Sequence, residues 1–354
     1  MERNLLNSDY TCEENLAKQA FGPGGSVRLV LLGMSPLAEA LAIEALKTAH
    51  FPNYIRDHSL RSRITWIAPE AFGKGKDFIA RHRSLMDESF WCFTDPASGV
   101  METHRPRSEG RLEDFVDFEW EFIEAGYREP LIKERIVRWN RSQRWTMTVA
   151  FAAEAASENS EARAFLESAL EGIPVFVAPE SCPRNPRLPL EDIGMLVNAL
   201  YQKTLETKCP PREVDMDLAR RLWASLPHQL RRNSMDAVMN LEAKMRSFNL
   251  DGGNPDAFDT LPREELALLA EVEHNRWSVV TLLSGKRPAS REEQAYIEQD
   301  IRLKDEYRKQ GIHYDLRAFS DLRPDAAGIP VAVYDEAMVR GIPLMVRYLK
   351  EMTE

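Results

Sequence analysis

A short segment in the C-terminal third of the 354-residue chain combines side chains that bind ligands in many proteins. Glu273, His274, Arg276 and Trp277 place an acid, an imidazole, a guanidinium and an indole within five residues. Glu273 and Trp277 are four positions apart, so a helix would present them on one face. An indole can stack on a base while the polar groups hold its edges or a phosphate. The structural alternative is a core Trp277, with His274 and Arg276 at the surface or in buried ion pairs.

A second candidate site follows the apolar run 27–33. Dinucleotide-binding turns read G-x-G-x-x-G because the glycines let the backbone approach a pyrophosphate. Residues 33–38 read Gly-Met-Ser-Pro-Leu-Ala, which keeps only the first glycine. We assign Gly33, Met34 and Ser35 to this crevice, together with Glu70 in the place of the ribose-binding acid. Two alternatives stay open: a working site for NAD(P) or another nucleotide, or a Rossmann core kept for structure.

Strands that alternate with helices would position this turn. Apolar runs predict buried strands at 27–33, 64–68, 146–152 and 175–177, and helices are expected at 36–48 and 159–170. This alternation predicts an α/β domain with a parallel sheet. A long charged insertion spans about residues 72–144, and we expect a helix at Leu112–Ala125 within it.

The second half of the chain has a helical pattern after a proline-rich stretch at 181–189. Helices are predicted at 190–207, 215–224, 226–249, 262–284 and 290–310, the last opened by a capping box of Ser290 and Glu293. We therefore divide the chain into an N-terminal extension (1–25), a Rossmann-like domain (26–180), an all-α helical connector (181–255) and an α-helical C-terminal domain (256–354).

The overall composition excludes several classes of protein. The chain carries 46 Lys plus Arg against 56 Asp plus Glu, a formal charge of -10, which argues against coating nucleic-acid polymers or anionic membranes. Its four cysteines form no C-x-x-C pair and its histidines lack metal-ligand spacing, so we predict no metal site. No segment reads as a signal peptide or membrane span, and we expect a cytoplasmic protein. Arg276, Lys286 and Arg287 would still suit an anionic small ligand.

The first half of the chain resembles a TrkA-N (RCK-type) Rossmann domain, the nucleotide-sensing module of potassium-transport regulators. The resemblance rests on residues 27–41 for the first strand and helix, and on 148–154 with Asn159 for the fourth strand and its exit. The missing second glycine and the long insertion depart from that family. The resemblance implies a nucleotide-binding Rossmann fold.

The C-terminal part is similar to a bacterial RyR domain, the small helical repeat named after ryanodine receptors. In that family an E-H-x-x-W helix is followed by an H-x-x-L-x-P-[FWY]-x-x-L loop and a closing Asp. Residues 270–277, Gly285, 313–322 and 334–335 carry the likeness, which covers about residues 262–348. Lys286 stands where an aromatic residue is common, and Ala318 replaces a proline. The resemblance implies a pocket for a nucleotide-like small molecule between helical hairpins.

These observations together favour a cytosolic sensor or regulatory binding protein for a nucleotide-derived ligand. Binding would shift domain arrangement or contacts within a homo-oligomer, and the family pairing suggests nucleotide signalling or antiviral defence as the setting. The expected helical pocket consists of Glu273, His274, Arg276, Trp277, His313 and Tyr334. The alternatives are an NAD(P)- or nucleotide-dependent enzyme that uses the Rossmann crevice, and a structural adaptor with vestigial pockets.

Overall fold

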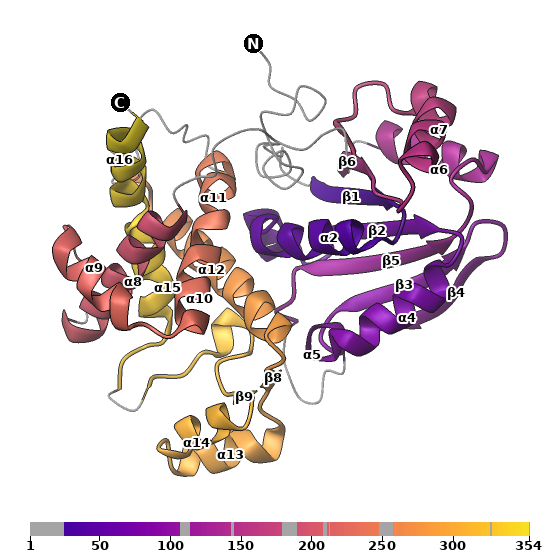
Figure 1. Ribbon diagram of the computed structural model, residues 1–354. Coiled ribbons are helices and arrows are strands. Elements are labelled where there is room, and N and C mark those ends of the chain that lie inside the picture. Colours follow the sequence, from indigo (N-terminus) through magenta and orange to yellow (C-terminus); the bar gives the residue numbers. More distant parts are fainter. Residues whose placement is uncertain are drawn as a thin grey trace. The chain divides into compact units, whose positions relative to one another are not determined.

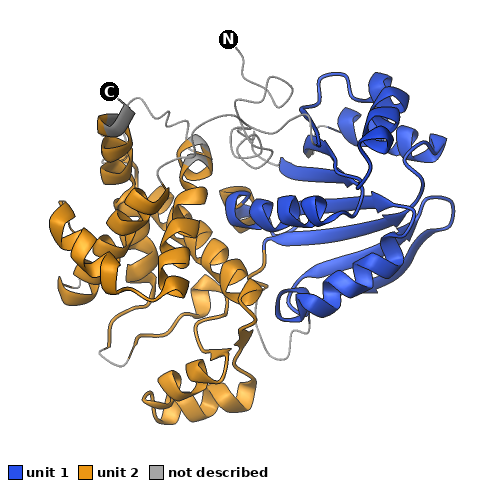
Figure 2. Ribbon diagram, viewed as in Figure 1, with its two compact units in different colours: residues 1–49, 56–107, 117–186 blue, residues 50–55, 108–116, 187–354 orange. Residues whose placement is uncertain are grey.

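The computed structural model (Figure 1) describes residues 25–106, 114–142, 145–178, 190–207, 211, 213–247, 258, 260–325 and 328–353. The chain divides into two compact units (Figure 2). Unit 1 comprises residues 1–49, 56–107 and 117–186, and unit 2 comprises residues 50–55, 108–116 and 187–354. Within the described ranges, no helix is both long and apolar enough to cross a lipid bilayer.

Unit 1 is an α/β fold in which the described residues contribute seven strands to one mixed sheet (Figure 1). The strands are β1 (Ser26–Leu32), β2 (Ser62–Ala68), β3 (Phe90–Asp95), β4 (Gly99–His104), β5 (Phe118–Glu124), β6 (Trp145–Phe151) and β7 (Val175–Val177). Their order is β4-β3-β5-β2-β1-β6-β7, and each neighbouring pair is parallel except β3 and β4. The four predicted strands are confirmed, with ends shifted by at most two residues.

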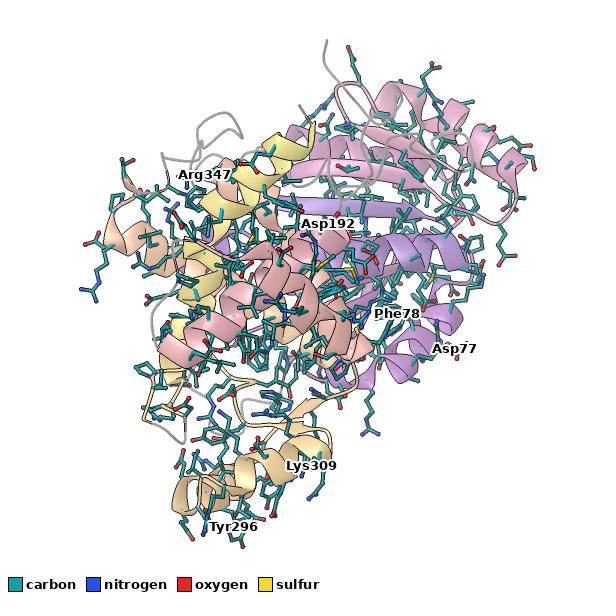
Figure 3. The ribbon with its side chains drawn as sticks, turned by 60° about the vertical axis from the view of Figure 1, so that its left-hand side comes forward. Asp77, Phe78, Asp192, Tyr296, Lys309 and Arg347 are labelled. Atoms are coloured by element: carbon teal, nitrogen blue, oxygen red, sulfur yellow. The ribbon has the colours of Figure 1, made fainter. Side chains whose placement is uncertain are left out.

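Helices cover both faces of this sheet, as the alternation of its side chains requires. The helices and turns of unit 1 are α2 (Pro36–Thr48), α4 (Ala71–Arg81), α5 (Arg83–Met86), α6 (Pro130–Arg141), α7 (Ala156–Leu166) and the 3-10 turn η1 (Glu167–Ala169). The short helix α3 (Pro52–Arg56) belongs to unit 2 except for its last residue. Val30 and Ile67 pack in one cluster with α6 and α7. Trp66 points the other way, with its ring 4.7 Å from that of Phe78 in α4. Phe78 lies on the sheet side of α4, whereas Asp77 is exposed (Figure 3).

The predicted helix at Leu112–Ala125 is wrong, because Phe118–Glu124 forms strand β5 between β2 and β3. Residues 112–113 of that prediction lie outside the described residues. Aromatic side chains at 118, 120 and 122 alternate with Glu119 and Glu121, and this period of two is typical of a strand. The predicted insertion at about 72–144 therefore supplies β3, β4 and β5 of the sheet.

Unit 2 is mainly helical. Its elements are α8 (Leu190–Thr207), α9 (Met216–Ser225), α10 (His228–Met239), α11 (Leu241–Ser247), α12 (Arg263–Leu283), β8 (Arg287–Pro288), α13 (Arg291–Gln299), α14 (Leu303–Lys309), β9 (Ile312–His313), η3 (Phe319–Asp321), α15 (Ala332–Arg340) and α16 (Ile342–Thr353). The predicted helices at 190–207, 215–224 and 262–284 are confirmed within one residue at each end. The capping box of Ser290 and Glu293 is also present.

Two of the predicted helices are each divided into two shorter helices. The helix predicted at 226–249 stops at Asn240, a buried residue whose amide donates to the carbonyl of His50. The helix predicted at 290–310 breaks at Asp300, whose carboxylate accepts a hydrogen bond from the backbone N–H of Arg302. Asp competes for local backbone hydrogen bonds in this way and ends helices. The end of the first prediction, residues 248–249, lies outside the described residues.

One hydrophobic cluster holds the helices of unit 2 together. It contains Leu196 and Leu200 of α8, Leu269 of α12 and Val339 of α15. Gly341, between α15 and α16, faces Leu200 so closely that a Cβ there would lie 2.5 Å from the leucine Cδ1. The boundary predicted at residue 255 has residues of this cluster on both sides, from α8 before it and from α12 and α15 after it.

A buried ion pair joins strands β1 and β5 on the α6 face of the unit 1 sheet. Arg28 is 1% exposed, and its Nη1 donates to Oε2 of Glu121 over 3.1 Å. The guanidinium carbon also lies 4.0 Å from the ring centre of Trp139 in α6. Burial lowers the pKa of Arg28 to about 10, although Glu121 opposes this effect. The acid in β5 therefore neutralises a cation that the sheet has removed from water.

We expect Glu121→Gln to lower the free energy of unfolding by about 3 kcal/mol, because Arg28 would stay buried without the carboxylate to which its Nη1 donates. The matched control is Glu119→Gln on the same strand, whose partner Arg63 is 27% exposed, and about 1 kcal/mol is expected there. Urea denaturation of the full chain measures both. Equal losses in the two variants would contradict the buried-pair argument.

Candidate functional site

Unit 2 contains a cavity of about 530 Å³, here called the unit 2 cavity. Its walls come from α8, α10, α12, α14, α15 and the segment around β9. The structure brings together at this cavity all six residues that the sequence assigned to a helical pocket: Glu273, His274, Arg276, Trp277, His313 and Tyr334. Three of the elements involved, α12, β9 and α15, are separated by long stretches of chain.

Glu273 is held by two cations under the wall of the cavity. Its carboxylate accepts a hydrogen bond from Nε of Arg276 at 2.9 Å and from Nη2 at 2.6 Å. Nζ of Lys244, in α11, also donates to it. Burial opposes the charge of Glu273, but Arg276 and Lys244 outweigh it and lower its pKa to about 2. All three side chains are at most 4% exposed, so this is a buried ionic triad.

His274 makes two hydrogen bonds that fix its ring. Nε2 donates to the carbonyl of Arg317 at 2.9 Å, and Nδ1 lies 3.3 Å from Oδ2 of Asp335. Burial lowers the pKa of His274, but the hydrogen bonds to Asp335 and Arg317 outweigh it, so the pKa is raised. Burial also raises the pKa of Asp335. Because both ring nitrogens are occupied, His274 offers the cavity only the surface of its ring.

His313 differs from His274, because one of its nitrogens stays available. Nδ1 accepts a hydrogen bond from the backbone N–H of Asp315 at 3.3 Å, which leaves the proton on Nε2 in the neutral ring. Burial lowers the pKa of His313 to about 4; Asp315 opposes the shift, whereas Arg308, Lys286 and Lys304 add to it. His313 is therefore a neutral hydrogen-bond donor at pH 7.

Aromatic rings line the cavity on two sides. Trp277 lies between the two histidines, with ring centres 5.5 Å from His274 and 4.9 Å from His313. Tyr334 meets Tyr201 of α8 at 5.4 Å, and its hydroxyl donates to Asp325 at 3.1 Å. Trp277 is only partly buried. The structural alternative thus holds for Arg276, which is in a buried ion pair, but Trp277 lines the cavity.

Sequence reasoning missed the contribution of α8 to this wall. Tyr201 and Asn198 line the cavity, and neither belongs to a recognisable motif. Asn198 is 5% exposed, and its amide nitrogen has no hydrogen-bond partner among the residues that the structure describes. An apolar helix with a buried Asn on its inner face was the available signal, because a buried amide needs a partner.

Of the three cations assigned to the pocket from sequence, Lys286 remains accessible. Arg276 belongs to the buried triad, and Arg287 forms a bidentate pair with Glu293 and is not among the residues lining the cavity. Lys286 lines the cavity and has no hydrogen-bonding or ionic partner within the described part of the chain. Burial lowers the pKa of Lys286, and Arg308 adds to the effect.

In unit 1, groups of the protein itself fill the space at the turn after β1. Gly33 has φ +113°, and a Cβ there would lie 2.4 Å from the backbone nitrogen of Ala153, at the end of β6. Ser35 donates from its hydroxyl to the carbonyl of Ala152 at 2.6 Å and accepts from the N–H of Ala38 at 3.2 Å. The serine therefore occupies the helix start where a phosphate would bind.

A groove of about 620 Å³ in unit 1, here called the unit 1 groove, is lined by Met34 and Ser35. Lys74 also lines it and donates to the carbonyl of Met34 at 3.2 Å. The same ammonium group is 2.8 Å from a carboxylate oxygen of Glu70, and this hydrogen bond raises the pKa of Lys74. Glu70 thus lies at the end of β2 as expected, but its carboxylate binds a lysine of the same unit.

Comparison with known proteins gave no match to a family model, to a curated protein or to a solved structure. The resemblances to TrkA-N and RyR domains therefore stay predictions. The candidate site rests on the geometry of the described residues alone.

Replacing Gly33 tests whether the crevice turn is a packing requirement. Gly33→Ala should lower the free energy of unfolding by about 3 kcal/mol, because the Cβ would overlap the backbone of β6 in a strained conformation. Gly172→Ala is the matched control: its φ is +75° but nothing lies within 4 Å of the added Cβ, so about 1 kcal/mol is expected. Chemical denaturation measures both, and similar losses would argue against tight packing at Gly33.

The low pKa of His313 predicts acid sensitivity. The folded pKa of about 4 lies below the ordinary value of 6.5, so the unfolded chain binds more protons between these values and stability falls as pH falls from 7 to 4. His313→Asn keeps an acceptor for the N–H of Asp315. Between pH 7 and pH 4, we expect its free energy of unfolding to fall by about 3 kcal/mol less than that of the wild type.

Urea denaturation of the full chain at pH 7, 6, 5 and 4 gives the measurement. His228→Asn changes an exposed histidine of α10 and should keep the wild-type pH dependence. An unchanged pH dependence in His313→Asn would show that His313 is not the group responsible.

Proposed function

We propose that unit 2 binds a nucleotide-derived small molecule in its cavity and that the protein acts as a ligand sensor or regulatory binding protein. The observation that carries the proposal is the convergence of aromatic rings and polar groups on one cavity of about 530 Å³. That volume is within the range of small-molecule sites, which combine apolar walls with a few polar groups. Trp277, Tyr201 and Tyr334 supply ring faces for a base.

The state of the charged groups supports binding rather than catalysis. Glu273 and Arg276 are neutralised within the triad, and both nitrogens of His274 are occupied. A general acid or base must be free to exchange a proton with the substrate. These groups instead hold each other in place, as expected for a preorganised binding wall.

The alternative of an NAD(P)-dependent enzyme that uses the unit 1 groove has less support. A dinucleotide site needs backbone N–H groups that are open to a pyrophosphate. Here the hydroxyl of Ser35 caps the helix, and the Lys74 ammonium bonds to Met34 and Glu70. The resemblance to RyR domains supports a nucleotide-like ligand, a homo-oligomer and a setting in nucleotide signalling or antiviral defence, by analogy alone.

A thermal-shift panel of nucleotides, cyclic dinucleotides, ADP-ribose and NAD tests the proposal. At saturation we expect at least one compound to raise the melting temperature by about 3 °C or more. Trp277→Ala should abolish the shift, because it removes a ring from the cavity wall. Trp91→Ala, a partly buried tryptophan of β3 in unit 1, should preserve it.

Two outcomes would overturn the proposal. The cavity would not be the site if the stabilising compound acted equally on the Trp277→Ala protein. Conversion of that compound by the wild-type chain, detected by mass spectrometry, would favour an enzyme instead.

A further inference from the structure

One end of the unit 2 cavity collects positive charge that the protein leaves uncompensated. Lys286, Lys304 and Arg308 all line the cavity. Lys304 is bound to Asp315 at 2.8 Å, in a pair in which both side chains are at most 11% exposed. Arg308 meets Asp305 at 3.3 Å, but this pair is largely exposed and contributes little. Lys286 has no such partner among the described residues.

The short ladder of β8 and β9 fixes these groups close to His313. The two strands are parallel, with Arg287 opposite Ile312 and Pro288 opposite His313. The N–H of Arg287 also donates to the carbonyl of Gly311 at 2.9 Å. Lys286 directly precedes β8, and Arg308 lies in the last turn of α14, the helix that leads into β9. A backbone ladder, rather than flexible side chains, therefore brings the cations and the imidazole to the same part of the wall.

The electrostatics of this cluster are unfavourable without an anion. Lys286 and Arg308 repel each other, and the cations also disfavour a proton on His313. Nε2 of His313 carries a proton for which no acceptor is found in the described residues. Two cations and one neutral N–H donor suit a group with several acceptor oxygens.

We propose that Lys286, Arg308 and His313 form a subsite for the phosphate of a phosphorylated ligand, a phosphomonoester or a pyrophosphate. This inference rests on the proposed function, because it assigns the charged end of the nucleotide to this part of the cavity. The base would then lie against the rings of Tyr201 and Tyr334, which also line the cavity.

Calorimetric titration of the full chain with paired probes tests the subsite. The probes are the four common ribonucleosides, their 5′-monophosphates, and inorganic pyrophosphate. We expect at least one monophosphate to bind ten-fold or more tightly than its nucleoside, with an affinity that falls as salt rises. Lys286→Gln should weaken the binding of phosphorylated probes at least ten-fold and leave nucleoside affinity unchanged.

Three variants control for indirect effects. Arg287→Gln changes the neighbouring residue, whose guanidinium is paired with Glu293 and does not line the cavity, and should bind like the wild type. Lys286→Arg keeps the charge and should retain phosphate affinity within about three-fold. Lys309→Gln, next to Arg308 on the exposed side of α14 (Figure 3), removes a cation outside the cavity and should also leave binding unchanged.

The outcomes separate this inference from the proposed function. If nucleosides and monophosphates bind equally, or if Lys286→Gln binds phosphorylated probes as Arg287→Gln does, the subsite is wrong and the cavity proposal stands. If pyrophosphate binds through Lys286 but no nucleoside or nucleotide does, the subsite is right and the nucleotide proposal is wrong. If none of these probes binds, the subsite is wrong, and the thermal-shift panel decides the cavity proposal.

Discussion

The wall of the unit 2 cavity depends on one buried carboxylate. Glu273 is removed from water and would be unfavourable as an anion without compensation, since burying an unpaired charge costs several kcal/mol. Lys244 and Arg276 supply that compensation, one from α11 and one from the next turn of α12. The triad therefore locks α12 against α11. Rotation of α12 about its axis would separate Glu273 from Lys244 in surroundings that solvate charges poorly.

Fixing α12 also fixes the residues that face the cavity. Trp277 follows Glu273 by four positions, about one helical turn, so the two share a face. His274 is held on the neighbouring face by Asp335 of α15 and by the carbonyl of Arg317. Residues at nearly every position from Leu269 to Ser278 are buried, and the charged side chains of this stretch bind partners inside the protein. The same bonds that satisfy these groups also position the tryptophan.

The sequence predicted much of the fold because much of it follows local rules. Strands β1, β6 and β7 are continuous apolar runs, and α2 carries a proline at its start, so both classes were found nearly to the residue. Strand β5 was missed because Glu119 and Glu121 resemble the exposed face of a helix. Their true partners, Arg63 and Arg28, lie on strands about 56 and 93 residues away in sequence. Only the sheet order reveals that pairing.

Part of the candidate site could also be predicted from the sequence. The segment 273–277 and the later His313 and Tyr334 carry a recognisable pattern, and the structure places them on one cavity. The pattern did not distinguish a cation buried in a pair, such as Arg276, from one left at the cavity, such as Lys286. That difference depends on which cations reach a carboxylate in the fold: Arg276 binds Glu273 and Arg287 binds Glu293. Tyr201 of α8 and Arg308 of α14 carry no local signal, because neither belongs to a recognisable motif; the buried Asn198 is the one residue of α8 that could have pointed to this wall.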